Sequence, residues 1–118
     1  MDLESIRKYC LKKKSTKESF PFGDTTLVFK VSGKIFLLMS LDSIPLKFNV
    51  KCDPEKAEEL REAYSSVIPA FHMNKKHWNT IILDGHINTK QIREMIDDSY
   101  ALVVRSLPLR ERKKLEKL

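Results

Sequence analysis

Two stretches rich in β-branched and aromatic residues, 25–31 and 34–41, are separated only by Ser32 and Gly33. Such residues favour extended backbone, and a two-residue link that contains glycine is typical of the tight turn of a β-hairpin. Residues 35–39 are all apolar and show no alternation, which predicts a central strand with apolar material on both of its faces. Because the two strands of a hairpin run antiparallel, this feature predicts an antiparallel sheet.

The segments around this hairpin begin and end at prolines, glycines and helix-capping residues. Their patterns predict strands at 46–52 and 78–83 and helices at 2–14, 54–66 and 88–107. Asp2 and Asp53 are expected to cap the first two helices, and Asn88 or Thr89 the third. Residues 109–118 are expected either to form a short basic helix that carries Leu115 or to fray. The predicted order is helix, three strands, helix, two strands, helix, in which only the second strand of the last pair, 78–83, has a predicted range. This order indicates an α+β fold with a mainly antiparallel sheet and helices packed on one face.

The size and charge of the chain indicate one globular domain with anionic partners. A chain of 118 residues with 42% hydrophobic and 32% charged residues is expected to form a single domain over residues 1–118, with a basic C-terminal tail at about 108–118. The net charge of +6 favours nucleic acid, phosphate ligands or an acidic protein surface. The positive charge is concentrated at both ends, with a local excess of +3 over residues 1–19 and +4 over residues 105–118.

The string HMNKKHWN at 72–79 and several shorter segments form a specific sequence pattern. The shorter segments are Phe20–Gly23 with Val28–Val31, Cys52–Glu55 with Leu60–Glu62, Leu83–Gly85, and Ser99–Tyr100 with Leu102–Val104. In this pattern the chain resembles the MmcQ/YjbR family of small bacterial proteins over about residues 5–110. The resemblance implies a two-layer YjbR-like or CyaY-like fold in the order α-β-β-β-α-β-β-α. Members are commonly described as DNA-binding because this fold resembles a double-wing arrangement, and the resemblance supplies no catalytic or metal-binding residue.

The segment 72–79 has the side chains expected of a nucleic-acid contact. Its lysines can neutralise phosphates, its carboxamides can donate hydrogen bonds, and its tryptophan can stack on a base. The same residues also suit a purely structural role, with the aromatic residues in the core and the asparagines in turns. The candidate nucleic-acid-binding residues, from this segment and from the two basic ends, are Asn74, Lys75, Lys76, His77, Trp78, Asn79, Lys12, Lys13, Lys14, Arg110, Arg112 and Lys113. Whether they share one face is open at this point.

No catalytic, cofactor or metal site is expected. The spacings of His72, His77 and His86 match no standard zinc motif, and the chain has no CxxC pair. Cys52 falls on the inward side of an alternating strand, where it is expected to be a small core residue rather than a nucleophile. The three separated glycines cannot form a phosphate-cradling loop. These observations favour a protein that is not an enzyme.

Two functions from different classes follow from these patterns. The first is a nucleic-acid-binding protein, with DNA as the expected partner, that contacts mainly phosphates and discriminates little between base sequences. The alternative is a protein-interaction or chaperone-like adaptor, or a homodimer, that uses an exposed sheet face marked by residues 35–39. The N-terminus lacks a signal-peptide pattern and the longest apolar run is too short for a membrane span, so a cytoplasmic protein is expected.

Overall fold

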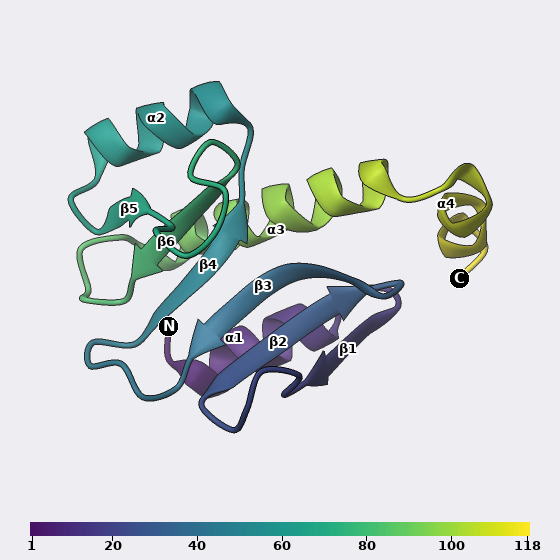
Figure 1. The fold of residues 1–118 in the computed structure, drawn as a ribbon, viewed down its shortest axis with the longest axis horizontal. Coiled ribbons are helices and arrows are strands. Elements are labelled where there is room, and N and C mark those ends of the chain that lie inside the picture. Colours follow the sequence, from purple (N-terminus) through teal and green to yellow (C-terminus); the bar gives the residue numbers. More distant parts are fainter.

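A six-stranded antiparallel sheet with helices on one face forms the centre of the computed structural model, which describes residues 1–118 (Figure 1). The strand order across the sheet is β1-β2-β3-β4-β6-β5. The strands are β1 (Thr16–Ser19), β2 (Thr26–Val31), β3 (Lys34–Ser40), β4 (Lys47–Lys51), β5 (Val67–Pro69) and β6 (Trp78–Ile82). The helices are α1 (Leu3–Leu11), α2 (Pro54–Ala63), α3 (Thr89–Ser106) and α4 (Leu109–Glu116). The predicted α+β class and antiparallel sheet are confirmed.

Polar caps and one proline set the starts of the first three helices. The Asp2 carboxylate accepts a hydrogen bond from the Ser5 amide at 2.9 Å, and the Ser5 hydroxyl accepts one from the Asp2 amide at 2.9 Å, which completes a capping box. Asn88 caps α3 by accepting from a first-turn amide at 2.8 Å. The prediction for Asp53 is wrong, because its side chain makes no capping bond; Pro54, with its φ suited to the first helical position, begins α2.

A β-bulge explains why the apolar run in β3 does not alternate. The pairing with β2 skips one residue between Ile35 and Leu37, so Phe36 has no partner in that strand. Phe36 and Leu37 consequently both belong to the buried core, where each has no exposed surface. Ile35 and Leu38 point to the opposite face and are partly buried. The run does supply apolar groups to both faces, as predicted, but most of its bulk lies on the helix side.

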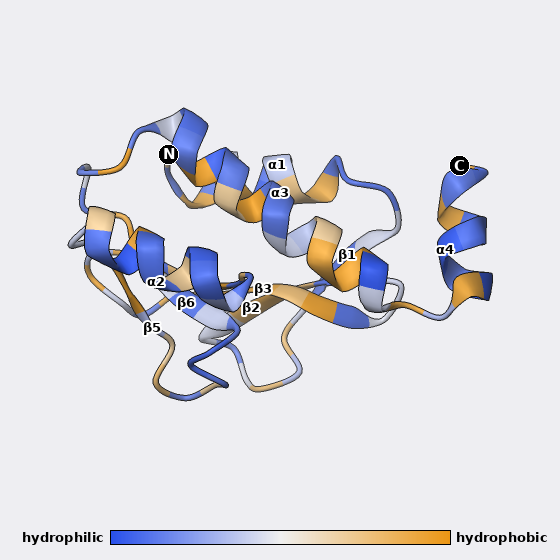
Figure 2. Cartoon of the chain, turned by 90° about the horizontal axis from the view of Figure 1, so that it is seen from above, coloured by the Kyte–Doolittle hydropathy of each residue, from blue (hydrophilic) through white to orange (hydrophobic).

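Three helices cover one face of the sheet (Figure 2). α1 lies against β1, α3 crosses β2, β3 and β4, and α2 lies against β5. The largest fully buried side chains between the two layers are Phe29, Phe36 and Phe48. The other face carries no helix, and we call it the outer face. None of the helices combines the length and the apolar character needed to cross a membrane.

β1 is missing from the predicted order, and two further elements, β5 and α4, had no definite prediction. β1 was not predicted because its sequence TKES has no apolar residue that could reveal a pattern. Residues 109–116 form α4, the helical alternative of the two considered for this segment, and Leu115 is 6% exposed. β5 has only three residues and ends at Pro69, which is too short for a periodic pattern to place it.

Candidate nucleic-acid interface

Three segments that are distant in the sequence meet at one end of the molecule. The amide of Ser32, in the turn between β2 and β3, donates to the carbonyl of Ser15 just before β1 at 3.3 Å. The ammonium group of Lys34, after the same turn, donates to the carbonyl of Ser106 at the end of α3 at 3.3 Å. Because α4 begins directly after this point, the turn, the start of β1 and α4 lie at the same end in both views (Figures 1 and 2).

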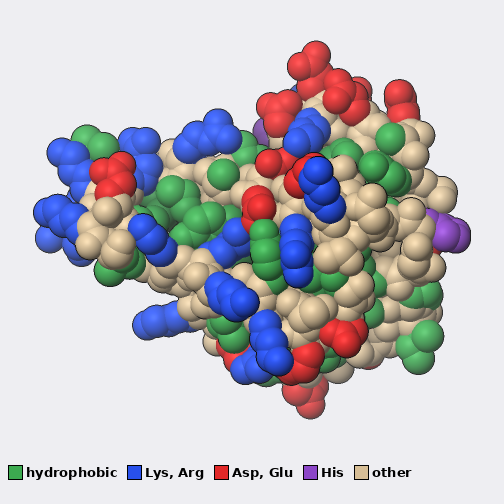
Figure 3. Space-filling model, turned by 180° about the vertical axis from the view of Figure 1, so that it is seen from behind, with side chains coloured by type: hydrophobic (Ala, Val, Ile, Leu, Met, Phe, Trp, Pro, Cys, Tyr) green, Lys and Arg blue, Asp and Glu red, His purple; other side chains and the backbone are tan.

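We call this region the basic end. Its cations come from all three segments and are Lys12, Lys14, Lys17, Lys30, Lys34, Arg105, Arg110, Arg112, Lys113, Lys114 and Lys117. Only two carboxylates accompany them in α4, and the single ion pair joins Lys114 to Glu111 at 3.5 Å. In the view from behind, blue side chains surround the projecting α4 (Figure 3). The N-terminal and C-terminal basic clusters therefore converge.

Lys13 has a structural role that its exposed neighbours in the sequence do not share. Its ammonium group pairs with Asp97 of α3 at 2.5 Å and lies 4.9 Å and 5.1 Å from the ring centres of Tyr9 and Tyr100. The Lys13 side chain is only 18% exposed. Such a cation is already neutralised and stacked, so it contributes little to the attraction of an external anion.

α4 displays the three predicted C-terminal residues. Leu115 is buried in the hydrophobic cluster that also includes Leu107, which precedes the helix, and this burial holds one side of α4 against the body. Arg110 and Lys113 are exposed, and Arg112 is partly buried. An apolar residue on one side and cations on the others are typical of an amphipathic surface helix.

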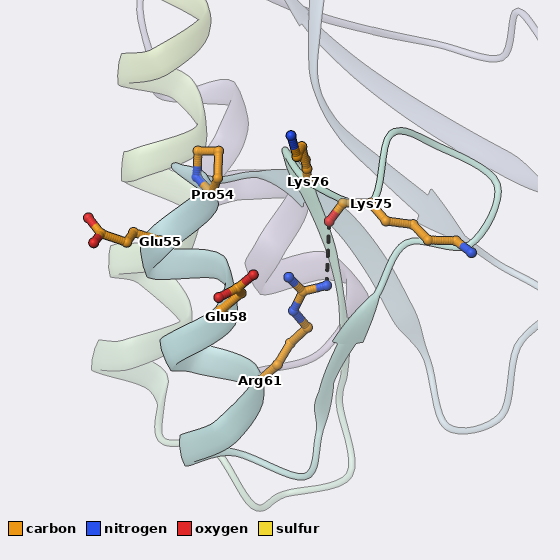
Figure 4. Close-up of a pocket in the computed structure, with 6 residues that line it drawn as sticks. All are labelled: Pro54, Glu55, Glu58, Arg61, Lys75 and Lys76. Atoms are coloured by element: carbon orange, nitrogen blue, oxygen red, sulfur yellow. Dashed lines mark hydrogen bonds between the residues drawn. The ribbon is translucent and has the colours of Figure 1, made fainter.

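The predicted segment around Lys75 and Lys76 lies elsewhere. It belongs to the connection between β5 and β6, at the edge of the sheet opposite to β1. Arg61 of α2 donates to the carbonyl of Lys75 at 3.4 Å (Figure 4). A hollow of about 380 Å³ at this place is lined by Pro54, Glu55, Glu58, Arg61, Lys75 and Lys76. The glutamates beside these lysines reduce the attraction for an anion, in contrast to the basic end.

Both asparagines of this segment are engaged by the fold. The side-chain oxygen of Asn74 accepts a hydrogen bond from the Lys76 amide at 3.0 Å and so closes a turn. Asn79 is 1% exposed, and its amide donates to the carbonyl of Ala57 in α2 at 3.3 Å. The inclusion of Asn79 in the nucleic-acid surface is therefore corrected, because its position in β6 points into the core. His77 and Trp78 are partly buried.

Six cations of the basic end are missing from the predicted interface. Lys17, Arg105, Lys114 and Lys117 lie within the two basic ends of the sequence, whereas Lys30 and Lys34 lie in neither. Lys30 and Lys34 flank the predicted turn at Ser32, and this position in the sequence could have indicated that they lie close together. Lys17 was recognised as part of the N-terminal basic cluster, but its position opposite Lys30 depends on the pairing of β1 with β2. Without β1 among the predicted strands, the sequence could not indicate that these two lysines lie together.

Both cysteines of the chain are free and buried. Burial raises the pKa of Cys10 to about 12 and also raises the pKa of Cys52, so both thiols stay protonated near neutral pH. No group of three or more histidine, cysteine, aspartate or glutamate side chains is placed to hold a metal ion.

The YjbR family model matches residues 11–102. The chain belongs to the YjbR family. It is 37% identical to the Escherichia coli O157:H7 protein YbdF over 113 residues, which cover 95% of this chain and 92% of YbdF. It is 33% identical to YjbR of Escherichia coli K12 over the full length of both proteins. The family predicted from the sequence is confirmed.

Solved structures of similar proteins have the same YjbR fold. The crystal structure of the Deinococcus radiodurans protein DR2400, described as a DUF419 domain, matches with a TM-score of 0.91 and 38% identity over 97% of this chain and 87% of that one. A Pseudomonas syringae protein matches with a TM-score of 0.75 and 29% identity over 86% of this chain and 98% of its own. None of these names states an activity. The residues matched by the family model end before α4, so three of the predicted interface residues lie outside them.

Proposed function

We propose that this YjbR-family protein binds nucleic acid, with DNA as its main partner, through phosphate contacts at the basic end. The observation that supports this proposal is the convergence of basic residues from the start of β1, the β2–β3 turn and α4. Clustered, largely unpaired cations create the local potential that attracts a phosphate backbone. The choice of DNA follows the resemblance to the MmcQ/YjbR family.

The side chains of the basic end favour phosphate contacts over the reading of base sequence. Residues 12–17, 30–34 and 105–118 include no asparagine, glutamine or aromatic residue. Carboxamides that pair with adenine and aromatic rings that stack on bases are therefore missing from this surface. Lysine and arginine contacts to phosphates fix position without carrying sequence information. Binding with little sequence discrimination is the expected result.

The proposal is tested with two variants that change the net charge equally at opposite ends of the sheet. In Arg110→Glu with Lys113→Glu, the charges of two exposed cations of α4 are reversed. In Lys75→Glu with Lys76→Glu, the charges of two lysines in the loop beside α2 are reversed. Fluorescence anisotropy with a labelled duplex would measure the affinity over a range of salt concentrations. For about six neutralised phosphates, the logarithm of the affinity falls with that of the salt concentration at a slope of about −5.

We expect the α4 variant to bind at least about tenfold more weakly and to have a slope shallower by about 2, since each lost phosphate contact removes about one unit. The loop variant should stay within about threefold of the natural protein. A larger loss in the loop variant would place the interface beside Lys75 instead. Absence of any binding at low salt and micromolar protein would refute the proposal.

A second candidate function, protein interaction through the outer face, has one observation in its favour. Ile35 and Leu38 lie on this helix-free face and are partly exposed. Part of the face is already covered, because the amide of Asn49 lies 3.6 Å from the sulfur of Met73 in the β5–β6 connection. If a second copy binds here, Leu38→Arg converts a dimer to a monomer in sedimentation velocity. A monomeric natural protein would remove homodimerisation from consideration.

A further inference from the structure

Two lysines of neighbouring strands face each other directly. Lys17 of β1 and Lys30 of β2 are partners in the antiparallel register. Like charges in this position destabilise a sheet. Neither lysine forms an ion pair, since the ion pairs of the protein involve other residues. The fold thus holds two uncompensated cations side by side.

The nearest carboxylate in the sequence is directed elsewhere. Glu18 pairs with Phe29, a core residue, and so points to the helix side of the sheet. Its two oxygens accept hydrogen bonds from the Arg7 guanidinium of α1 at 2.5 Å and 2.7 Å. The repulsion between Lys17 and Lys30 is therefore not relieved from within the chain, and an external anion would relieve it.

The two lysines line a hollow whose other walls are also polar. It has a volume of about 420 Å³ and is lined by Ser15, Lys17, Lys30, Ser32 and Gly33, with no hydrophobic residue among them. Small-molecule sites usually have volumes of about 300–1,000 Å³. The space is sufficient for a phosphate group together with part of the nucleotide that carries it.

Both serines of the hollow adopt a backbone conformation that glycine would adopt more easily. Ser15 has φ 56° and Ser32 has φ 47°, in the left-handed region. The conformation of Ser32 is required by the β2–β3 turn, in which Gly33 also has a positive φ of 85°. The turn does not account for Ser15, and residues with a Cβ in this conformation concentrate at ligand sites. Each serine supplies a hydroxyl group, a hydrogen-bond donor that glycine lacks and that suits a phosphate oxygen.

We propose that this hollow binds a phosphate group of a nucleic acid. The ammonium groups of Lys17 and Lys30 neutralise the phosphate, and the serine hydroxyls donate to its oxygens. The inference rests on the proposed function for the identity of the ligand, and it adds a defined position for one phosphate. That phosphate is either the terminal group of a strand or a diester within it, and the chemistry of recognition is the same.

The site is tested first with inorganic phosphate and a matched pair of variants. Lys17→Met with Lys30→Met removes two charges from the hollow. Lys47→Met with Lys51→Met removes two charges from β4, which is separated from β2 by β3 in the sheet. NMR titration would follow the amide signals of Lys17 and Gly33, with sodium chloride at equal ionic strength as the reference.

We expect phosphate to shift these amide signals in the natural protein and in the β4 variant, and the hollow variant to bind at least about tenfold more weakly. Without phosphate, the hollow variant should melt at an equal or higher temperature, because the repulsion between the two lysines is gone. Phosphate effects equal to those of chloride, or full phosphate binding by the hollow variant, would overturn the inference.

Oligonucleotides with and without a 5′-phosphate then identify the source of the phosphate. Tighter binding of the 5′-phosphorylated strand assigns the hollow to a terminal phosphate, and equal affinities that both fall in the hollow variant assign it to a diester. If oligonucleotides bind the hollow variant as well as the natural protein, only the inference fails. If inorganic phosphate binds at the hollow but no oligonucleotide binds the protein, only the proposed nucleic-acid function fails.

Discussion

A single buried hydroxyl joins the helix layer to the sheet. Ser99 of α3 has no exposed surface, and its hydroxyl donates to the carbonyl of Phe36 at 2.6 Å and accepts from the amide of Lys51 at 2.8 Å. Leu37 pairs with Val50, so Phe36 and Lys51 would form the next pair of this ladder. The bulge interrupts the ladder there, and the serine satisfies both backbone groups in its place.

Ser99→Ala should lower the free energy of unfolding by about 2 kcal/mol, because a buried donor and a buried acceptor both lose their partner. Ser106→Ala is the matched control, since Ser106 is an exposed residue of the same helix whose hydroxyl donates to the carbonyl of Val103. Its effect should be below about 0.5 kcal/mol. Urea denaturation measures both, and equal effects would contradict the role of Ser99.

The ion pair between Arg7 and Glu18 should make stability depend on pH. The Arg7 guanidinium lowers the pKa of Glu18, so the stabilisation is present above the unfolded pKa and is lost as the pH falls through the lower folded value. The side chains are 40% and 28% exposed, so solvent screening limits the contribution. Glu18→Gln should cost about 0.5–1 kcal/mol at pH 7.

The difference between Glu18→Gln and the natural protein should shrink as the pH falls through the lowered folded pKa of Glu18 and disappear in strong acid, once the natural glutamate is also protonated. Glu4→Gln serves as the control, because Glu4 contacts the same arginine at 3.1 Å but is 56% exposed. Its effect at pH 7 should be smaller. Denaturation curves at pH 7 and in strong acid measure these effects, and a difference that persists in acid would show that Glu18 contributes through packing instead.

Among the four helices, α4 buries the fewest residues. Its buried residue is Leu115, its first residue Leu109 is 57% exposed, and Pro108 precedes it. Proline prevents the preceding residue from continuing α3, so the direction of α4 is set by the link and by the contact of Leu115. An element with so few buried contacts is expected to open without unfolding the rest of the molecule.

Leu115→Ala should release α4 while the body stays folded. Hydrogen exchange of the amides of residues 109–116 should accelerate by about tenfold or more. The unfolding free energy reported by the fluorescence of Trp78, in the distant strand β6, should change by less than about 1 kcal/mol. Leu109→Ala should alter neither quantity, and a large global destabilisation by Leu115→Ala alone would show that α4 folds cooperatively with the sheet.

Over the whole molecule, charge is distributed asymmetrically. The basic end lies at the β1 side of the sheet, whereas α2, which lies against β5, carries Glu55, Glu58, Glu59 and Glu62. The longest extent of the molecule is 39 Å, several times the Debye length of about 8 Å at physiological salt. The two ends therefore act independently in the cell, and the asymmetry orients an anionic partner only at low ionic strength.

The double substitution Glu59→Gln with Glu62→Gln removes two exposed negative charges from α2 and tests whether the two ends of the molecule act independently. Neither residue forms an ion pair, so stability should be nearly unchanged. At about 10 mM salt the affinity for duplex DNA should rise by less than about threefold, and at 150 mM it should equal that of the natural protein. A rise that persists at 150 mM would mean that α2 lies within the interface.

Local sequence patterns were sufficient to predict most helices, strands and turns of the fold. The alternation of 46–52, the turn at Ser32 and Gly33 and the caps at Asp2 and Asn88 each depend on neighbours within a few residues, so they could be recognised without the structure. β1 was not predicted, because an edge strand needs no apolar pattern when the neighbouring strand supplies the core contacts. The family could also be recognised, since it rests on strings of adjacent residues.

The placement of the cations was decided only by the tertiary structure. Local sequence showed that both ends are basic, but strand pairing and the packing of α4 determined that they share one end with Lys30 and that Lys75 lies at the opposite edge of the sheet. The physical reason is that these contacts join residues far apart in the chain. No local backbone preference specifies these contacts, because they form only when the apolar surfaces of all the elements are buried together in one core.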